Sequence, residues 1–141
     1  MNSGGYLYLT SNNTIGAIIY PDGSYNTISD QRFKKDIEGL GKTLQKVKKL
    51  NPVSFSLKHL KDAKKSIGFI AQEVQALFPE AVNKAKSLEE GGEDILSISY
   101  SDFGPIAIKA IQEQQILIEK QAGQIKRLQG KVSTIERKLK N

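Results

Sequence analysis

A serine and a lysine, Ser29 and Lys34, lie five residues apart in the run Ser-Asp-Gln-Arg-Phe-Lys. A serine hydroxyl becomes a nucleophile when a lysine amine takes its proton, and such a pair needs no histidine. The hydroxyl of Ser29 can also reach the carbonyl of the preceding residue, Ile28, through a five-membered ring, so that proximity favours attack. The run therefore predicts an acyl shift followed by hydrolysis, which would cut the chain between Ile28 and Ser29.

Each residue of this run also has a purely structural interpretation. Ser-Asp before a charged helical stretch is typical of a helix N-cap. A free lysine side chain has a pKa of about 10.4, so a lysine base needs burial or cationic neighbours. Without them, Lys34 is a solvated surface residue. Arg32 can stabilise an oxyanion or form a surface ion pair, and Asp30 can cap the turn or orient Arg32 or Lys34.

The chain of 141 residues divides by pattern into three parts. Residues 1–28 are rich in Gly, Asn and Ser and alternate like strands, which are expected at 6–10, 15–20 and 25–28 around turns at 11–13 and 21–24. This leader is too small to bury a core alone. Residues 29–104 mix short helical and strand patterns. Residues 105–141 form one long helix, so the fold class expected is α+β.

The middle part has several expected elements. Helices are expected at 42–50 and 71–78, strands at 53–57 and 95–100, a strand or helix entry at 67–70, and an exposed loop at 84–94. The expected core residues are Phe69, Ile70, Val74, Leu77 and Phe78. Leu96, Ile98 and Tyr100 are expected to share the buried face of the last strand.

The last part carries a heptad repeat. Its a positions are Ile111, Ile118, Ile125, Val132 and Leu139, and its d positions are Gln114, Gln121, Leu128 and Ile135. Four to five such heptads predict a coiled coil. Two glutamines at d favour a partly hydrated trimer over a tight dimer. Gly123 and Gly130 lie outside the seam and weaken the helix by about 1 kcal/mol each.

Composition excludes several classes of site. There is no cysteine and one histidine, His59, so cysteine catalysis, disulfides and Cys/His zinc sites are excluded, and no metal or cofactor is expected. His59 is expected to be a solvated loop residue. No apolar run reaches the length of a membrane helix. The net charge is +6, and residues 105–141 hold 8 basic and 3 acidic residues. Because this tail has no aromatic residue for base stacking, a solvated coiled-coil face is favoured over nucleic-acid binding.

The order of motifs resembles a known family. After the Ser-Asp-x-Arg-x-Lys run come Leu-Asn-Pro-Val-Ser-Phe at 50–55, Ile-Gly-Phe-Ile-Ala-Gln-Glu-Val-Gln at 67–75, Phe-Pro-Glu-Ala-Val at 78–82, Ser-Ile-Ser-Tyr at 97–100 and the long helix. Residues 29–141 resemble the C-terminal intramolecular chaperone and auto-processing domain of phage tailspikes and tail fibres, endosialidases among them.

The resemblance implies a function and a site. It implies self-cleavage directly before Ser29, with Lys34 as base and with Asp30 and Arg32 as further candidates. Gln72 and Glu73 of the Ala-Gln-Glu block are candidates as well. Some relatives carry histidine at the position of Gln72, so a histidine-assisted mechanism is not expected here. Glu73 is a structural carboxylate or a site residue.

The resemblance also implies partners and a location. The expected assembly is a homotrimer whose folding client and substrate is its own N-terminal stalk, with no nucleic-acid or membrane partner. It would be made in the infected bacterial cytoplasm; the leader would end in the virion tail and residues 29–141 would be released. Two alternatives stay open: a trimerisation or adaptor domain without catalysis, and a basic coiled coil that binds nucleic acid.

Overall fold

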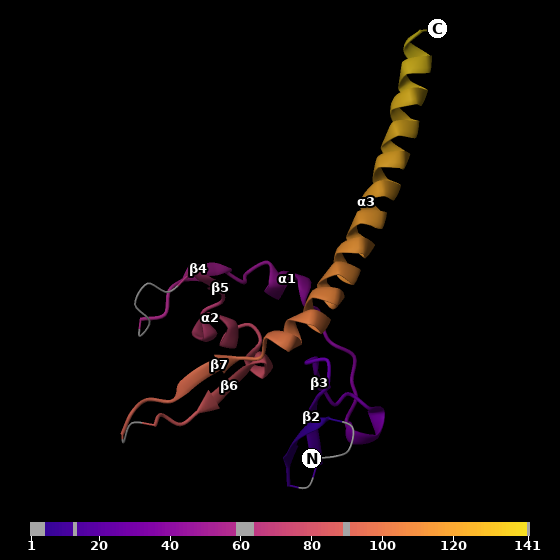
Figure 1. Cartoon of the computed structure of the whole chain (residues 1–141). Coiled ribbons are helices and arrows are strands. Elements are labelled where there is room, and N and C mark those ends of the chain that lie inside the picture. Colours follow the sequence, from indigo (N-terminus) through magenta and orange to yellow (C-terminus); the bar gives the residue numbers. More distant parts are fainter. Residues whose placement is uncertain (1–4, 13, 59–63, 89–90, 141) are drawn as a thin grey trace. The chain divides into compact units, whose positions relative to one another are not determined.

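A computed structural model describes residues 5–12, 14–58, 64–88 and 91–140 of the chain. Its contacts divide the chain into two compact units, Met1–Gly39 and Leu40–Asn141, and each is described by itself. Small antiparallel sheets combine with one long helix, which confirms the expected α+β class (Figure 1).

The first unit holds a three-stranded antiparallel sheet in the order β1 (Leu7–Ser11), β2 (Thr14–Ile19) and β3 (Tyr25–Thr27). The three expected strands are therefore present. The turn between β2 and β3 is closed by hydrogen bonds from Gly23 N to Tyr20 O and from Tyr20 N to Ser24 O, both 2.9 Å. Gly23 has a φ of 84°, which a residue with a side chain rarely adopts.

This sheet does not bury a core of its own, as expected. Among the described residues of the unit only Ala17 is buried. Large apolar side chains remain exposed, namely Tyr6, Leu7, Tyr8, Leu9, Ile15 and Tyr25. A three-stranded sheet of this size needs another surface to cover these groups.

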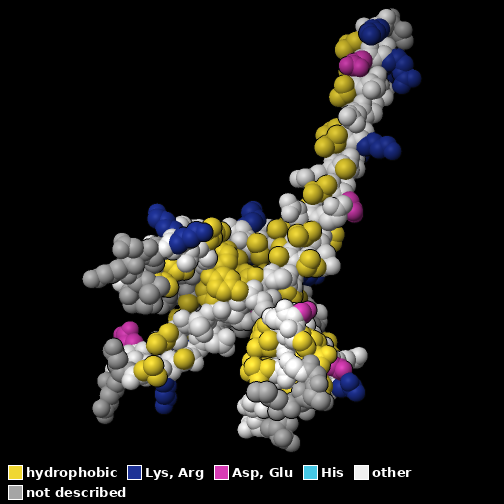
Figure 2. Space-filling model, viewed as in Figure 1, with side chains coloured by type: hydrophobic (Ala, Val, Ile, Leu, Met, Phe, Trp, Pro, Cys, Tyr) yellow, Lys and Arg dark blue, Asp and Glu magenta, His cyan; other side chains and the backbone are white. Residues whose placement is uncertain are grey.

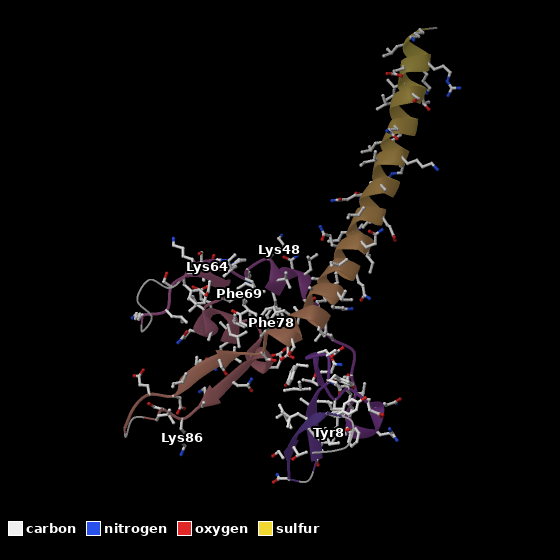
Figure 3. The ribbon with its side chains drawn as sticks, in the orientation of Figure 1. Tyr8, Lys48, Lys64, Phe69, Phe78 and Lys86 are labelled. Atoms are coloured by element: carbon white, nitrogen blue, oxygen red, sulfur yellow. The ribbon has the colours of Figure 1, made fainter. Side chains whose placement is uncertain are left out.

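The second unit has a small core beneath the start of its long helix. It combines the strand pairs β4 (Val53–Phe55) with β5 (Ser66–Gly68) and β6 (Val82–Ala85) with β7 (Ile95–Ile98), and the helices α1 (Leu44–Val47), α2 (Ala71–Gln75) and α3 (Phe103–Leu139). Val74, Phe78, Ala81 and Ile106 form the buried cluster. The part of this unit that precedes α3, residues 40–102, is the body. Figure 3 shows Phe78 and Phe69 inside the body and Lys48, Lys64 and Lys86 at its surface.

Helix α1 is fastened to α3 by one acidic side chain. The carboxylate of Glu113 accepts the backbone N–H groups of Thr43 at 2.9 Å and Leu44 at 3.2 Å. The buried hydroxyl of Thr43 donates to the carbonyl of Ile106 at 3.4 Å. The Thr43 hydrogen bond is the main cause that lowers the pKa of Glu113, against a partial desolvation that raises it. These bonds supply acceptors for the free N–H groups at the start of α1.

Several expectations for the second unit need correction. The helices expected at 42–50 and 71–78 are shorter, and Pro79 begins a 3-10 turn, η2 (Pro79–Ala81). The loop expected at 84–94 was wrong at its start, because Lys84 and Ala85 belong to β6 and pair with β7. Both side chains are exposed, so the segment lacks the alternation of a half-buried strand.

Two expected core residues lie at the surface. Ile70 is 42% exposed, although Val74 and Phe78 are buried and Phe69 and Leu77 pack against them. Tyr100 does not end the strand but begins a 3-10 turn, η3 (Tyr100–Asp102), and is 52% exposed. Leu96 and Ile98 are half-buried as expected. The backbone turns after β7, which breaks the period-2 pattern before Tyr100.

The long helix α3 is present and starts two residues before the expected position. Its 37 residues span about 55 Å at 1.5 Å per residue. The five a positions are 49–81% exposed, and Figure 2 shows hydrophobic side chains along one side of the helix with lysine and arginine projecting from the other. This apolar face lacks a partner within the described chain, and the trimer stays a prediction.

Candidate functional site

The run from Ser29 to Lys34 folds into one tight turn. Residues Gln31–Phe33 form the 3-10 turn η1, in which Phe33 N donates to Asp30 O at 3.1 Å and Lys34 N to Gln31 O at 3.0 Å. Asp30 caps the turn, since its carboxylate accepts the Arg32 backbone N–H at 2.8 Å. A 3-10 turn completes one revolution in three residues, with a rise of about 2 Å per residue. It therefore brings Lys34 back toward Ser29.

The turn joins the two residues predicted to do chemistry. Lys34 Nζ lies 2.8 Å from Ser29 Oγ, and both side chains are exposed. This distance lies within the reach required for proton transfer between a nucleophile and its base. In the neutral form, the same amine can accept the serine proton across this contact.

Asp30 and Arg32 form a second pair beside the first. Arg32 Nη2 lies 2.7 Å from Asp30 Oδ2, and Arg32 Nε donates to both carboxylate oxygens at 3.1 and 3.2 Å. The Arg32 side chain, and then its backbone N–H, hold the pKa of the Asp30 carboxyl below its ordinary value, and Asp30 raises the pKa of Arg32. Arg32 is 84% exposed, as in a surface ion pair. Asp30 thus caps the turn and orients Arg32 at once.

The residue before the predicted cut is tied to the sheet. Strand β3 ends at Thr27, and Ile28 N still donates to Gly16 O on β2 at 3.1 Å. Ile28 is half-buried, whereas Ser29 is exposed. The Ile28–Ser29 peptide bond is therefore held by the sheet on one side and by the capped turn on the other.

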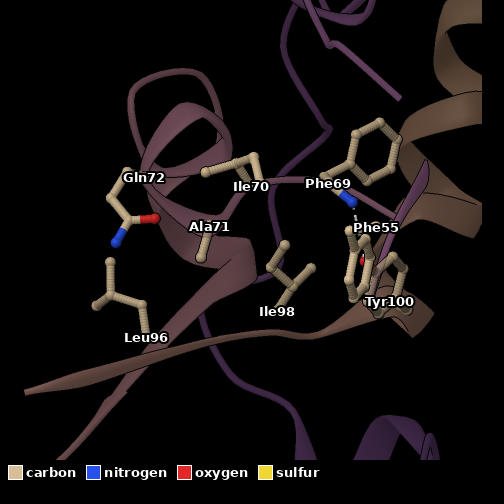
Figure 4. Close-up of a pocket in the computed structure, with 8 residues that line it drawn as sticks. All are labelled: Phe55, Phe69, Ile70, Ala71, Gln72, Leu96, Ile98 and Tyr100. Carbon is tan, nitrogen blue, oxygen red and sulfur yellow. Dashed lines mark hydrogen bonds between the residues drawn. The ribbon is translucent and has the colours of Figure 1, made fainter. Parts of the chain in front are cut away.

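Gln72 and Glu73 belong to the other compact unit, in the first turn of α2, and both are exposed. Gln72 lines an open pocket of about 340 Å³ together with seven other residues: Phe55, Phe69, Ile70, Ala71, Leu96, Ile98 and Tyr100. Figure 4 shows the Gln72 amide at one end, near Leu96, and the aromatic rings at the other. A catalytic role for Gln72 or Glu73 remains a prediction.

A contact between Gly68 and Tyr100 was missed from the sequence. A Cβ added to Gly68 would collide with the Tyr100 hydroxyl and approach the Phe55 ring to 3.3 Å. The same hydroxyl accepts the Phe69 N–H at 3.1 Å, and the rings of Phe69 and Tyr100 stack at 6.3 Å. Gly68 thus gives the Gly-Phe-Ile-Ala-Gln-Glu block its close approach to η3. The only sign of this contact in the sequence is the glycine at position 68, because a glycine permits a close approach.

The described part of the chain contains no group of three or more His, Cys, Asp or Glu side chains that could hold a metal ion. Within the residues that the structure describes, none of the helices has the length and apolar character to cross a membrane. The solvated position expected for His59 lies outside the described residues.

Comparisons with known proteins confirm the resemblance inferred from the motifs. Residues 29–83 match the family model described as "Chaperone of endosialidase", whose short name is that of a peptidase family. The match begins at Ser29 and contains the turn, the pocket-lining Gln72 and most of the body.

Two phage proteins are similar over a longer segment. The "Long tail fiber protein Gp37" of Enterobacteria phage M1 is 37% identical over 102 residues, which cover 65% of this chain and 39% of the relative. The protein of the same name from Enterobacteria phage Ox2 is 39% identical over 92 residues, covering 60% of this chain and 35% of the relative. The chain thus matches less than half the length of these relatives.

Proposed function

We propose that residues 29–141 are the C-terminal folding module of a phage tail fibre, which joins three chains and then cuts itself from the leader. The cut falls between Ile28 and Ser29, with Ser29 as nucleophile and Lys34 as base. The observation that carries this proposal is the 2.8 Å contact between Ser29 Oγ and Lys34 Nζ, at the first residue of the family match.

The chemistry balances within the chain and one water molecule. Ser29 Oγ attacks the carbonyl carbon of Ile28 while its proton passes to the neutral amine of Lys34. The C–N bond then breaks, and the leaving amine of Ser29 takes the proton back from Lys34. An ester joins Ile28 to the Ser29 side chain. Water hydrolyses this ester, which leaves a carboxylate on Ile28 and a free amine and hydroxyl on Ser29.

Assembly offers a control on this reaction. A lysine acts as a base only as a neutral amine, and removal from water favours the neutral form. Ser29 and Lys34 are exposed in the single chain. Packing of three chains around the turn would desolvate the pair, so cleavage would follow assembly rather than precede it.

The long helix supports the trimer. From Ile111 to Leu139 its a positions carry exposed apolar side chains. The d positions Leu128 and Ile135 are apolar and exposed as well, whereas the other two are glutamines. Association along this seam raises the local concentration of the chains. A β-rich stalk has many contacts between residues distant in sequence and folds slowly without such help. Removal of the module would then trap the stalk behind its unfolding barrier.

The three parts of the chain have separate fates in this proposal. Residues 1–28 are the end of the β-rich stalk, residues 29–104 are the auto-processing body, and residues 105–141 are the coiled coil. The exposed apolar side chains of the leader sheet support its place in a larger stalk. The leader would remain in the virion tail and the other two parts would leave.

A trimerisation module without catalysis is the second candidate. The observation that favours it is the surface geometry of the turn, where Asp30 caps η1 and pairs with an exposed Arg32. The substitution Ser29→Ala separates the two. The proposal expects native mass spectrometry to find a trimer of uncut chains for this variant and a trimer of residues 29–141 for the wild type. Identical uncut trimers for both proteins would favour the module without catalysis.

A further inference from the structure

The first turns of α3 pack against the body of the same chain with one side of the helix. Another side of the helix, which carries the a and d positions, remains exposed. In the heptad with Ile111 at a, the residues that face the body are Ile106, Ala110, Glu113 and Leu117, at the successive positions c, g, c and g. Ile106 and Ala110 are buried, and Glu113 is half-buried. The body therefore covers the c/g flank, and the a/d seam stays open.

Hydrogen bonds fix the body on this flank. Glu113 binds the start of α1 through Thr43 and Leu44, and Thr43 is also bonded to the carbonyl of Ile106. The attachment is thus made by buried or half-buried polar groups as well as by apolar packing. It holds the start of α1 against position c of the helix, and the groove beside it extends to Leu117 at g.

Position g determines which surface of another copy the body meets. In a parallel coiled coil, the g residues of one helix lie against the e residues of its neighbour. Position b lies beside e, on the side away from the seam. A body attached at c and g therefore lies next to the e/b flank of the neighbouring α3.

The body presents a groove at this place. The groove lies between α1 and α3, has a volume of about 370 Å³, and is lined by Lys42, Leu44, Gln45, Glu113, Ile116 and Leu117. Leu117 is 47% exposed and Leu44 half-buried, so part of its wall is apolar. Lys42 and Glu113 give it one charge of each sign, and Lys42 lies close enough to be a minor cause of the lowered pKa of Glu113.

The e/b flank of α3 complements this groove. At the height of Leu117 it carries Gln115 and Ala122 at e and Glu119 at b, with Gln115 Nε2 donating to Glu119 Oε1 at 2.9 Å. Residues 105–141 contain three acidic residues, Glu113, Glu119 and Glu136. Because Glu113 already caps α1, Glu119 is the acidic side chain available near the groove. One heptad before Gln115, Ile108 also occupies an e position on this flank. Its side chain is 57% exposed although it lies outside the a/d seam.

We propose that the groove between α1 and α3 receives the e/b flank of a second copy's α3, with Ala122 against Leu117 and Glu119 beside Lys42. The inference rests on the parallel trimer of the proposed function. It makes each body part of the interface, so that assembly involves more than the helical seam.

Site-specific cross-linking tests the contact directly. The chain has no cysteine, so the double variant Lys42→Cys/Glu119→Cys carries only the two thiols of interest. A bismaleimide short enough to join two thiols at the separation of a lysine–glutamate ion pair is added to the native protein. The products are then separated on a denaturing gel. The inference expects covalent dimers and trimers. The matched control, Lys42→Cys/Glu136→Cys, moves the second thiol about 25 Å along the same helix and should give monomers.

The outcomes separate the contact from the trimer. A native trimer whose 42/119 variant yields only monomers on the gel would overturn the contact and leave the proposed assembly standing. A native mass of one chain would overturn both. A second measurement uses charge: Glu119→Lys should lower the thermal midpoint of the trimer, and the added change Lys42→Glu should restore it. A double variant no more stable than Glu119→Lys would contradict the pairing.

Discussion

Lys34 Nζ and Ser29 Oγ meet at 2.8 Å because the turn between them is closed by Asp30, whose carboxylate accepts the Arg32 N–H. The capping residue and the predicted nucleophile–base pair are therefore parts of one local structure. This explains how a short run can be a helix-cap-like turn and a nucleophile–base pair at once. The two interpretations of the run do not exclude each other.

The variant Lys34→Gln should slow cleavage by a factor of about 10² or more, because it removes the proton acceptor but keeps a polar side chain next to Ser29. The fraction of cut chains is measured against time on a denaturing gel. Lys35→Gln is the control, since Lys35 is also exposed in the same unit but has no contact with Ser29 among those described. Equal cleavage rates for the two variants would rule out Lys34 as the base.

The prediction that the a and d positions of α3 form the trimer seam can be tested with two neighbouring isoleucines, one in the seam and one outside it. Ile118 at a and Ile116 at f are 49% and 65% exposed in the single chain. Ile118→Asn should abolish or strongly weaken the trimer, because a polar side chain enters the seam. Ile116→Asn should weaken it clearly less, because Ile116 lies outside the seam and only lines the groove beside α1. Sedimentation velocity over a range of concentrations measures the difference. Trimers of equal stability would show that the heptad register is wrong.

Gly68→Ala should destabilise the body by about 1–3 kcal/mol, because the added methyl group collides with the Tyr100 hydroxyl. Urea unfolding followed by circular dichroism gives the free energy of unfolding. Gly123→Ala is the contrasting variant: a Cβ there meets nothing within 4 Å, so α3 should gain about 1 kcal/mol. If Tyr100→Phe fails to relieve any of the loss caused by Gly68→Ala, the collision is not its cause.

The tie between Glu113 and α1 should depend on pH. Hydrogen bonds from Thr43 and Leu44 lower the pKa of Glu113 in the folded chain. The stabilisation from these bonds is therefore fully present above the ordinary carboxyl pKa of about 4.3. It is lost as the pH falls through the lowered pKa that Glu113 has in the folded chain. Glu113→Gln should raise amide exchange at residues 43–50 at neutral pH. The wild type should approach this variant only in acid.

Glu136→Gln is the control for that measurement, since Glu136 is exposed near the end of α3. It should leave exchange at residues 43–50 unchanged. An unchanged exchange rate in Glu113→Gln as well would mean that the carboxylate does not hold α1.

Local patterns predicted most of what depends on neighbouring residues. The leader strands, the helix α3 and the approach of Lys34 to Ser29 all follow from spacings of a few residues. The resemblance further identified the block in which Gly68 and Gln72 lie. These features need no knowledge of the tertiary fold.

The missed features involve residues that are distant in sequence. Glu113 meets Thr43 across 70 residues, and Tyr100 meets Phe69 across 31. Lys84 and Ala85 form a strand because β7 pairs with them, although their own side chains show no buried face. Such contacts depend on how the whole unit packs. The hydrophobic periodicity of a single segment contains no information about them.

The central claim is that the chain cuts itself before Ser29, and intact mass spectrometry of freshly purified wild-type and Ser29→Ala protein tests it most directly. The account predicts two wild-type fragments, residues 1–28 and 29–141, whose masses add up to the full chain plus one water, and a single full-length mass for the variant. A full-length wild-type mass, in protein shown to be trimeric, would contradict self-cleavage.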